Sequence, residues 1–479
     1  MRESRTGFAL GLLALLAALA FALLLGLRAD PMDRSSETRC VEVVRRMVET
    51  RELLVPYFGD KVRLQKPPLF YWAGAAAATL FGETGPLPVR TVSVCAALGL
   101  VALVGLWGRS LGGGGAGLLA AGLLAVMVQV HTSGRRGDAE MLLALLSTAA
   151  LFCFDRIADG GWRRGLWAFA VLAGLAFLTK ATAIVFTIAL PILVYLALER
   201  RLRALRERSV LASLALAAGI GISWYVAILV FVPGALQLFR DALLLPLGSG
   251  EARAAAHFRP VWWYLSVLPA RALPASIALP LVLWRLGSTR LQRGEPRRRF
   301  AALVFLVPFA AFSLLPQKQK HYTLSMLPGL ALCSADALAA AAREFGARFR
   351  WGLRVLGPLG AAACATGAVL HALFFHWLDD LSPLASAACV ALPFTAFALA
   401  GAAALAARPG AAAAGLLFGF VLLAGLENGA IEPRATELAK TYATLPIDER
   451  ERLVFLSRDH PDFARLFFWL QAQVANDDD

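Results

Sequence analysis

Charged residues are scarce in this sequence, and their scarcity excludes the commonest class of protein. Only 17% of the 479 residues are charged, whereas 58% are hydrophobic, and the mean hydropathy is +0.64. Such a chain has too few polar side chains to cover an ordinary core in water. The composition therefore excludes a soluble globular protein and predicts one that crosses a membrane several times.

Cysteine and histidine are also scarce, with six residues of each. Five of the cysteines lie inside apolar segments and only Cys40 lies in a predicted loop, so no disulfide framework is indicated. The histidines have no carboxylate pair at ligand spacing, and the sequence predicts no metal site. It indicates no cofactor, and it leaves open whether the protein depends on a divalent metal.

An internal duplication is missing too. Many transporters carry two repeated halves, with broken helices and buried charges in both. Here the polar residues are instead concentrated in one long loop, residues 28–88, and in a few neighbouring loops. A transporter or flippase for a lipid-linked substrate is therefore the second hypothesis, behind an enzyme.

The basic residues are numerous but lie in short clusters between apolar segments. The formal net charge is +14 and the isoelectric point is near 10.1. Clusters of this kind fix the orientation of membrane proteins by the positive-inside rule. The charge pattern thus predicts contact with membrane lipids and no binding of nucleic acid.

The sequence contains about thirteen apolar segments long enough to cross a bilayer. They begin near Phe8, Thr91, Ala116, Met141, Leu166, Ala183, Val210, Val261, Phe300, Tyr322, Val355, Leu384 and Ala411. The first is longer than the roughly 7–15-residue apolar core of a signal peptide, which predicts an uncleaved helix with a cytoplasmic N-terminus. An odd number of spans places the C-terminus on the outer, periplasmic face.

These segments predict an all-α, multi-pass protein of a bacterial-type plasma (inner) membrane, and we expect it to be a monomer. Residues 1–427 form the transmembrane domain, and residues 28–88 form its first periplasmic loop with interfacial helices. Residues 428–479 contain a strand-like run and a short apolar helix. They predict a small α/β subdomain on the outer face.

The first loop contains a predicted amphipathic helix with an acid in its first turn. Between Ser36 and Met47, apolar residues recur at helical spacing, which indicates a helix lying on the membrane surface. Glu37 lies in the first turn, where the helix dipole favours a carboxylate. Glu37 is a candidate catalytic base, or it is simply the charge with which many helices begin.

The same loop ends in a lysine followed by two prolines and an aromatic segment. Lys66 precedes Pro67 and Pro68, which favour an extended backbone before the segment Leu69 to Phe81. A cation fixed at this level suits a lipid phosphate. The alternative is a lysine that extends to the lipid headgroups without a specific role.

Other outer loops supply further candidate residues. Asp138 directly precedes an apolar span and follows two arginines, so it either lines a site or forms a loop ion pair. The densest group of outer-face donors, and one basic residue before an aromatic belt, are candidate phosphate ligands: Lys318, Lys320, His321, Tyr322 and Arg259.

Taken in order, the motifs in these loops resemble the GT-C class of membrane glycosyltransferases. The similarity is to protein O-mannosyltransferases and to the aminoarabinose transferase that modifies lipid A. It extends from Glu37 to about Pro328 and is carried by motifs at 37–42, 54–56, 66–72, 137–141, 174–180, 260–264 and 318–322.

The resemblance implies a GT-C fold and an inverting hexosyl or pentosyl transferase that acts at the outer face. Its donor would be a polyprenyl-phosphate sugar, and its acceptor a lipid, a protein or a glycan. The family usually has Asp-Glu where this chain has Ser36-Glu37. The base would then be Glu37, Asp33 or Asp138, and Glu37 together with Asp138 is favoured. An inactive homologue that binds the carrier lipid is the third hypothesis.

Overall fold

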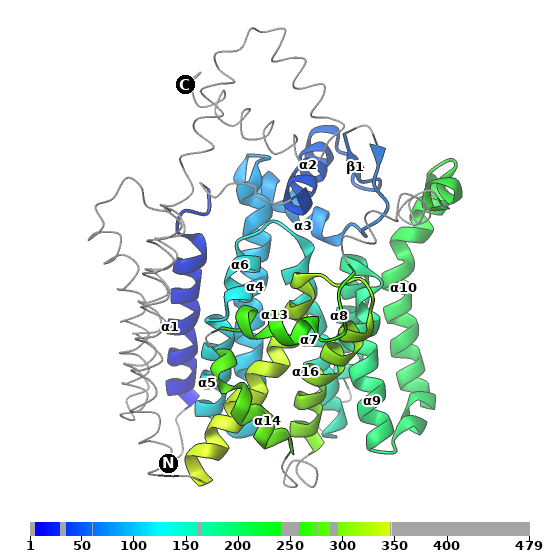
Figure 1. The fold of residues 1–479 in the computed structure, drawn as a ribbon. Coiled ribbons are helices and arrows are strands. Elements are labelled where there is room, and N and C mark those ends of the chain that lie inside the picture. Colours follow the sequence, from blue (N-terminus) through cyan, green and yellow to red (C-terminus); the bar gives the residue numbers. More distant parts are fainter. Residues whose placement is uncertain are drawn as a thin grey trace, which may run out of the picture. The chain divides into compact units, whose positions relative to one another are not determined.

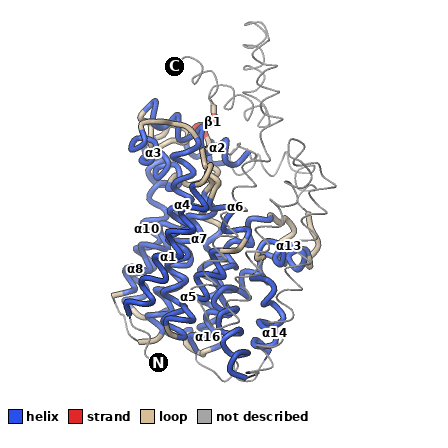
Figure 2. Tube along the Cα trace, turned by 90° about the vertical axis from the view of Figure 1, so that its left-hand side faces the viewer, coloured by secondary structure: helices blue, strands red, loops and turns tan. Residues whose placement is uncertain are grey.

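A computed structural model of the chain describes residues 5–28, 35–59, 61–160, 164–240, 258–273, 275–287, 296–344 and 346. Figures 1 and 2 show that the described chain is helical nearly throughout. This agrees with the predicted all-α class. The three spans expected after Val355 and the subdomain expected at 428–479 lie outside the described residues, so they stay predictions.

The elements follow one another in this order along the chain: α1 (Arg5–Leu24), α2 (Ser35–Thr50), β1 (Tyr57–Phe58), β2 (Lys61–Val62), α3 (Leu69–Phe81), α4 (Pro86–Gly112), α5 (Gly114–Ala125), α6 (Val128–Gly134), α7 (Ala139–Ala158), α8 (Gly165–Lys180), η1 (Val185–Ala189), α9 (Leu190–Leu198), η2 (Leu202–Arg206), α10 (Arg208–Phe231), α13 (Trp263–Arg271), η3 (Ala275–Ala278), α14 (Leu279–Gly287), α16 (Pro296–Leu314) and η4 (Lys320–Met326).

The chain divides into two compact units, which are described separately. The first comprises Met1–Leu16, Val43–Thr84 and Pro88–Glu344, and the second comprises Ala17–Glu42, Gly85–Leu87 and Phe345–Asp479. The described part of the second unit is mainly the end of α1 and the start of α2. The helix bundle discussed below belongs to the first unit.

Five described helices are long and apolar enough to cross a membrane, and a bent pair makes a possible sixth span. The five are Thr6–Leu24, Pro86–Gly112, Ala139–Ala158, Arg208–Phe231 and Lys320–Glu344. The bent pair consists of α5 and α6, which meet at an angle of 64°.

The span expected near Val261 is not one continuous helix, and this prediction is wrong. The segment forms α13, η3 and α14, each nine residues or fewer. Pro269 lies inside α13, and Pro274 and Pro280 follow it. Because proline lacks a backbone N–H and clashes with the preceding turn, three prolines within twelve residues divide the segment.

The bundle of the first unit combines helices that are near in sequence with helices that are far apart in it. Helix α8 packs between α7 and α10, and α16 packs against α9 and η4 (Figure 1). Gly329, in the span Lys320–Glu344, lies against α16, where an added Cβ would come within 2.5 Å of the Phe305 backbone nitrogen. Only glycine permits this approach, which brings the backbones of the span and α16 close together at this point.

The first turn of α16 connects three other helices through consecutive arginines. Arg297 Nη2 lies 2.6 Å from Asp155 Oδ2 of α7, and Arg298 Nη1 lies 2.9 Å from Asp336 Oδ1 of the Lys320–Glu344 span. Arg299 Nη2 lies 3.2 Å from Glu199 Oε1 at the end of α9. Successive helical residues project about 100° apart, so one turn can reach three neighbours.

The loop between α2 and α3 folds onto the bundle as a small ordered unit. Strands β1 and β2 form an antiparallel hairpin, and Arg46 Nη1 of α2 donates to the Gly59 carbonyl at its turn over 2.6 Å. Trp224 of α10 donates its indole N–H to the Leu54 carbonyl over 2.8 Å. An apolar cluster that includes Val55, Leu178 and Trp224 joins the loop to α8 and α10. Lys66, at the end of this loop, is thereby held near the end of α8.

Candidate active site

The polar centre of the bundle is the carboxylate of Glu140, in the first turn of α7. Its Oε1 lies 2.7 Å from Nζ of Lys180, the last residue of α8, and 3.5 Å from Nε2 of His321 in η4. The Glu140 side chain is 10% exposed and that of Lys180 is 21% exposed. A buried carboxylate requires such partners, because ions leave water only at a high cost in free energy.

Aromatic rings enclose this ion pair on one side. The Lys180 ammonium lies 5.2 Å from the centre of the Tyr322 ring, which is within the range of a cation–π contact. Tyr322 packs edge-on against His321, with ring centres 4.8 Å apart, and its ring lies tilted against Phe312 of α16, with ring centres 5.0 Å apart. The rings fix the orientation of both donors.

A cavity of about 160 Å³ adjoins these groups. Its wall combines Glu140, Lys180, His321 and Tyr322 with the hydroxyls of Thr182, Thr187 and Ser325 and with the apolar side chains of Leu143, Ala144, Ala183, Phe186, Phe312, Leu315 and Leu324. Part of the wall is η1, a single π-helical turn, which is a feature frequent at functional sites. We call the end of the bundle that holds this cavity the Glu140 end.

Lys66 adds a further positive charge to the Glu140 end. Its charge acts on the Glu140 carboxylate and on the Tyr322 hydroxyl. One carboxylate therefore faces two ammonium groups and an imidazole, so the local charge is positive even when the imidazole is neutral. A positive, partly enclosed cavity of this kind attracts an anion.

Asp138 lies beside this cluster in a capping position. Its side chain accepts the backbone N–H of Glu140, with Oδ1 3.2 Å from the nitrogen, and it is the N-cap of α7. Ser93 of α4 donates to the Asp138 carbonyl over 3.3 Å. An N-cap carboxylate fixes the first turn of its helix. Asp138 thus orients the backbone of Glu140.

The remaining predicted phosphate ligands occupy two adjoining loops. Lys318 is buried, and its ammonium donates to the carbonyls of Arg259, over 2.9 Å, and of Leu315. Two of its three N–H groups thus tie the loop after α16 to the segment before α13. The Arg259 guanidinium donates to the Phe258 carbonyl, and Lys320 is exposed. Phosphate binding by these residues stays a prediction.

The predicted acids of the first loop belong to a different part of the chain. Glu37 lies in the first turn of α2, as expected, and it is buried. It belongs to the second unit, whereas Lys66, Asp138 and His321 belong to the first. Asp33 lies outside the described residues. The catalytic roles of Glu37 and Asp33 stay predictions.

Sequence reasoning assigned no role to Glu140 or Lys180, although both lie within motifs that carried the family resemblance. A physical argument from the sequence could have paired the two residues. An acid at the start of an apolar helix needs a cation at the same depth, and Lys180 ends the next apolar segment. Among the described residues, no three His, Cys, Asp or Glu side chains converge to hold a metal ion.

Comparison of the sequence with known proteins identifies related enzymes. A family model described as dolichyl-phosphate-mannose-protein mannosyltransferase matches residues 65–239. The undecaprenyl phosphate-alpha-4-amino-4-deoxy-L-arabinose arabinosyl transferase 2 of Proteus mirabilis is 29% identical over 342 residues. That match covers 69% of this chain and 60% of the Proteus protein, so the chain spans less than two thirds of that relative.

Comparison of the fold points to the same group. The crystal structure of ArnT from Cupriavidus metallidurans in the apo state matches with a TM-score of 0.72 at 18% identity, covering 98% of this chain and 85% of that chain. The structure of the same enzyme bound to undecaprenyl phosphate matches with a TM-score of 0.70, at the same identity and coverage. The sequence and fold matches together confirm the predicted resemblance to GT-C glycosyltransferases of the ArnT and protein mannosyltransferase type.

Proposed function

From its relationship to the GT-C glycosyltransferases, we propose that this chain transfers a hexose or pentose from a polyprenyl-phosphate donor of the undecaprenyl-phosphate type. The acceptor is a hydroxyl or phosphate group on a lipid, a protein or a glycan at the outer face of the membrane. The names of the related arabinosyl transferases and the undecaprenyl phosphate bound to ArnT support this donor class.

The observation that carries the proposal is the positive cavity at the Glu140 end. A donor in which a phosphodiester links sugar and polyprenol bears one negative charge on its phosphate. Glu140 holds Lys180 and His321 in position, with Oε1 2.7 Å from the Lys180 ammonium and 3.5 Å from His321 Nε2. Cations that are already oriented stabilise the charge that develops on a departing phosphate at little reorganisation cost.

In the proposed reaction, the acceptor oxygen attacks the anomeric carbon from the face opposite the phosphate. The new carbon–oxygen bond forms as the bond to the phosphate oxygen breaks, and its electron pair leaves with polyprenyl phosphate. Lys66 and Lys180 stabilise the additional negative charge. Glu37 takes the acceptor proton as general base, which a carboxylate can do and the Ser36 hydroxyl cannot.

The test uses the purified full chain in detergent with labelled undecaprenyl-phosphate-linked aminoarabinose and with the mannose-linked carrier. Lipid A and a serine- and threonine-containing peptide serve as acceptors. We expect the protein to release undecaprenyl phosphate with at least one donor. Replacing Glu37 by Gln should lower turnover roughly 10²–10⁴-fold, the usual effect of losing a general base.

The matched control is Glu49→Gln, an exposed acid in the same helix that pairs with Arg45 in the preceding turn. It should leave turnover unchanged. Full activity of Glu37→Gln would show that Glu37 is not the general base, but it would not contradict the proposed transferase activity. Release of undecaprenyl phosphate from neither donor, by a protein that still binds it, would contradict the proposal and favour a carrier-binding homologue.

A further inference from the structure

The opposite end of the bundle contains a second cavity, far from Glu140. Helix α16 begins at this end and finishes at the Glu140 end, and its 19 residues span roughly 28 Å at 1.5 Å per residue. The cavity measures about 80 Å³ and is lined by residues of α4, α14, α16 and the Lys320–Glu344 span. We call this end of the bundle the arginine end.

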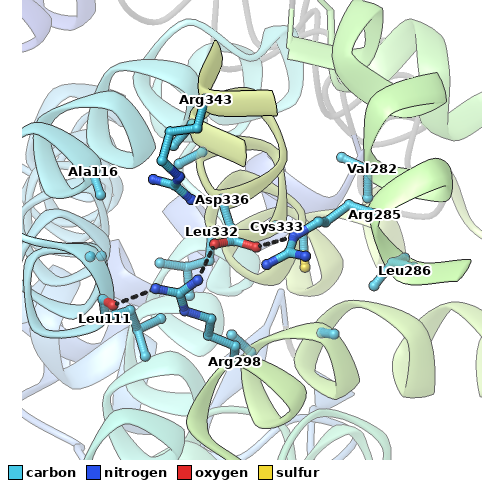
Figure 3. A pocket seen from close by; sticks show the side chains of 16 residues that line it. Leu111, Ala116, Val282, Arg285, Leu286, Arg298, Leu332, Cys333, Asp336 and Arg343 are labelled. Atoms are coloured by element: carbon cyan, nitrogen blue, oxygen red, sulfur yellow. Dashed lines mark hydrogen bonds and ion pairs between the residues drawn. The ribbon is translucent and has the colours of Figure 1, made fainter. Parts of the chain in front are cut away.

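Three arginines and one acid supply the charges that line this cavity. Arg285 Nε of α14 and Arg298 Nη1 of α16 each lie 2.9 Å from an oxygen of Asp336. Arg343 lines the same cavity, and Figure 3 shows its guanidinium turned toward Asp336, beside those of Arg285 and Arg298. One carboxylate thus faces three guanidinium groups, which leaves two positive charges in excess.

The other wall residues include Val282, Leu286 and Leu332, which are apolar. A phosphate placed against the guanidinium groups could therefore continue into an acyl chain packed along this wall. A single water needs roughly 10–15 Å³ of such space, so the cavity can hold the oxygens of a phosphate group. Arginine is the side chain best suited to phosphate, because its planar fork donates two parallel hydrogen bonds.

We infer that the cavity formed by Arg285, Arg298 and Arg343 binds a phosphate group, either the headgroup of an anionic phospholipid or free phosphate. The positive-inside rule assigns the arginine end to the cytoplasmic side, where basic pockets between spans bind anionic headgroups. The site is distinct from the donor cavity and does not depend on the transferase proposal.

Arg343 provides the sharpest test, because it is exposed and its loss leaves the ion pairs of Asp336 with Arg285 and Arg298 in place. The change is Arg343→Gln, and the matched control is Arg203→Gln, an exposed arginine of η2 that does not line the cavity. Unfolding temperature in detergent verifies that both variants are folded. Binding of phosphatidylglycerol, phosphatidylcholine and inorganic phosphate is measured on the full chain by native mass spectrometry and calorimetry.

We expect Arg343→Gln to weaken phosphatidylglycerol or phosphate binding about fivefold, which corresponds to ~1 kcal/mol per basic residue near a membrane surface. Arg203→Gln should leave that binding unchanged. An effect seen with phosphatidylglycerol alone identifies the ligand as a lipid headgroup, and an effect seen with inorganic phosphate as well identifies free phosphate. Equal binding by both variants and the wild type, or equal binding of phosphatidylcholine, would overturn the inference.

Discussion

Asp138 illustrates how one residue type supports two roles that the sequence alone cannot separate. A carboxylate before a helix is both a candidate base and a good N-cap. In the structure Asp138 Oδ1 lies 3.2 Å from the Glu140 backbone nitrogen, which is the capping geometry. The proposed function therefore gives Asp138 a positioning role and assigns the proton transfer to Glu37.

The comparison of Asp138→Asn with Asp138→Ala separates capping from catalysis. Asparagine caps a helix as well as aspartate does, whereas alanine costs about 1 kcal/mol of stability. We expect Asp138→Asn to keep turnover within a few-fold of the wild type, and Asp138→Ala to lower both the unfolding temperature and turnover. If Asp138→Asn unfolds at the wild-type temperature but its turnover is roughly 10²-fold lower or worse, Asp138 acts as a base instead.

The roles of individual residues were harder to predict from the sequence than the helices that carry them. The sequence identified Lys66 and His321 as candidate phosphate ligands, because both lie in loops of the outer face beside apolar segments. It gave Glu140 no role, although it placed this residue at the end of an outer loop, directly before the span that begins near Met141. The pairing of Glu140 with Lys180, 40 positions later, depends on how α7 and α8 pack. Sequence spacing does not contain that information.

At the scale of elements, α16 is held by ion pairs that differ in burial. The Asp155 side chain is 1% exposed, and it accepts hydrogen bonds from Arg297 and from the Trp107 indole. The Arg299 side chain is 31% exposed and pairs with Glu199. A buried carboxylate that loses its partner is strongly destabilising, whereas a more exposed pair contributes little.

We therefore predict that Arg297→Gln destabilises the protein more than Arg299→Gln, although the two residues are only two positions apart. Loss of Arg297, the partner of the buried Asp155, should cost roughly 3 kcal/mol, and loss of the more exposed Arg299 less than about 1 kcal/mol. Thermal unfolding of the two variants in the same detergent gives the comparison. Equal unfolding temperatures would show that Asp155 is not the anchor of α16.

The sequence predicted continuous spans well where the apolar run had no interruption, as for α4, α7 and α10. It failed at α13 and α14, where the hydropathy is high enough but the prolines divide the helix. Asp336, in the Lys320–Glu344 span, accepts from Arg285 of α14 and Arg298 of α16. Hydropathy gives the depth of a residue, but its partner follows from how the helices cross.

At the scale of the whole chain, the order of motifs predicted the fold class, and the fold comparison agrees with it. Loops far apart in sequence converge because α7 begins, and α8 and α16 end, at the same end of the bundle. The spans expected after Val355 and the subdomain at 428–479 stay predictions. The central claim is that the cations at the Glu140 end hold the phosphate of the carrier lipid.

The direct test of that claim is the dissociation constant for labelled undecaprenyl phosphate, measured on the full chain in detergent. The variants are Lys66→Gln and the double replacement Glu140→Gln with Lys180→Gln, which removes a cation without leaving a buried carboxylate unpaired. The control is Arg45→Gln, a surface residue whose loss removes the same charge as Lys66→Gln does. We predict binding at least about tenfold weaker in both test variants, the effect of one charge-assisted hydrogen bond, and unchanged binding in the control. Wild-type affinity in Lys66→Gln and in the double variant would contradict the account.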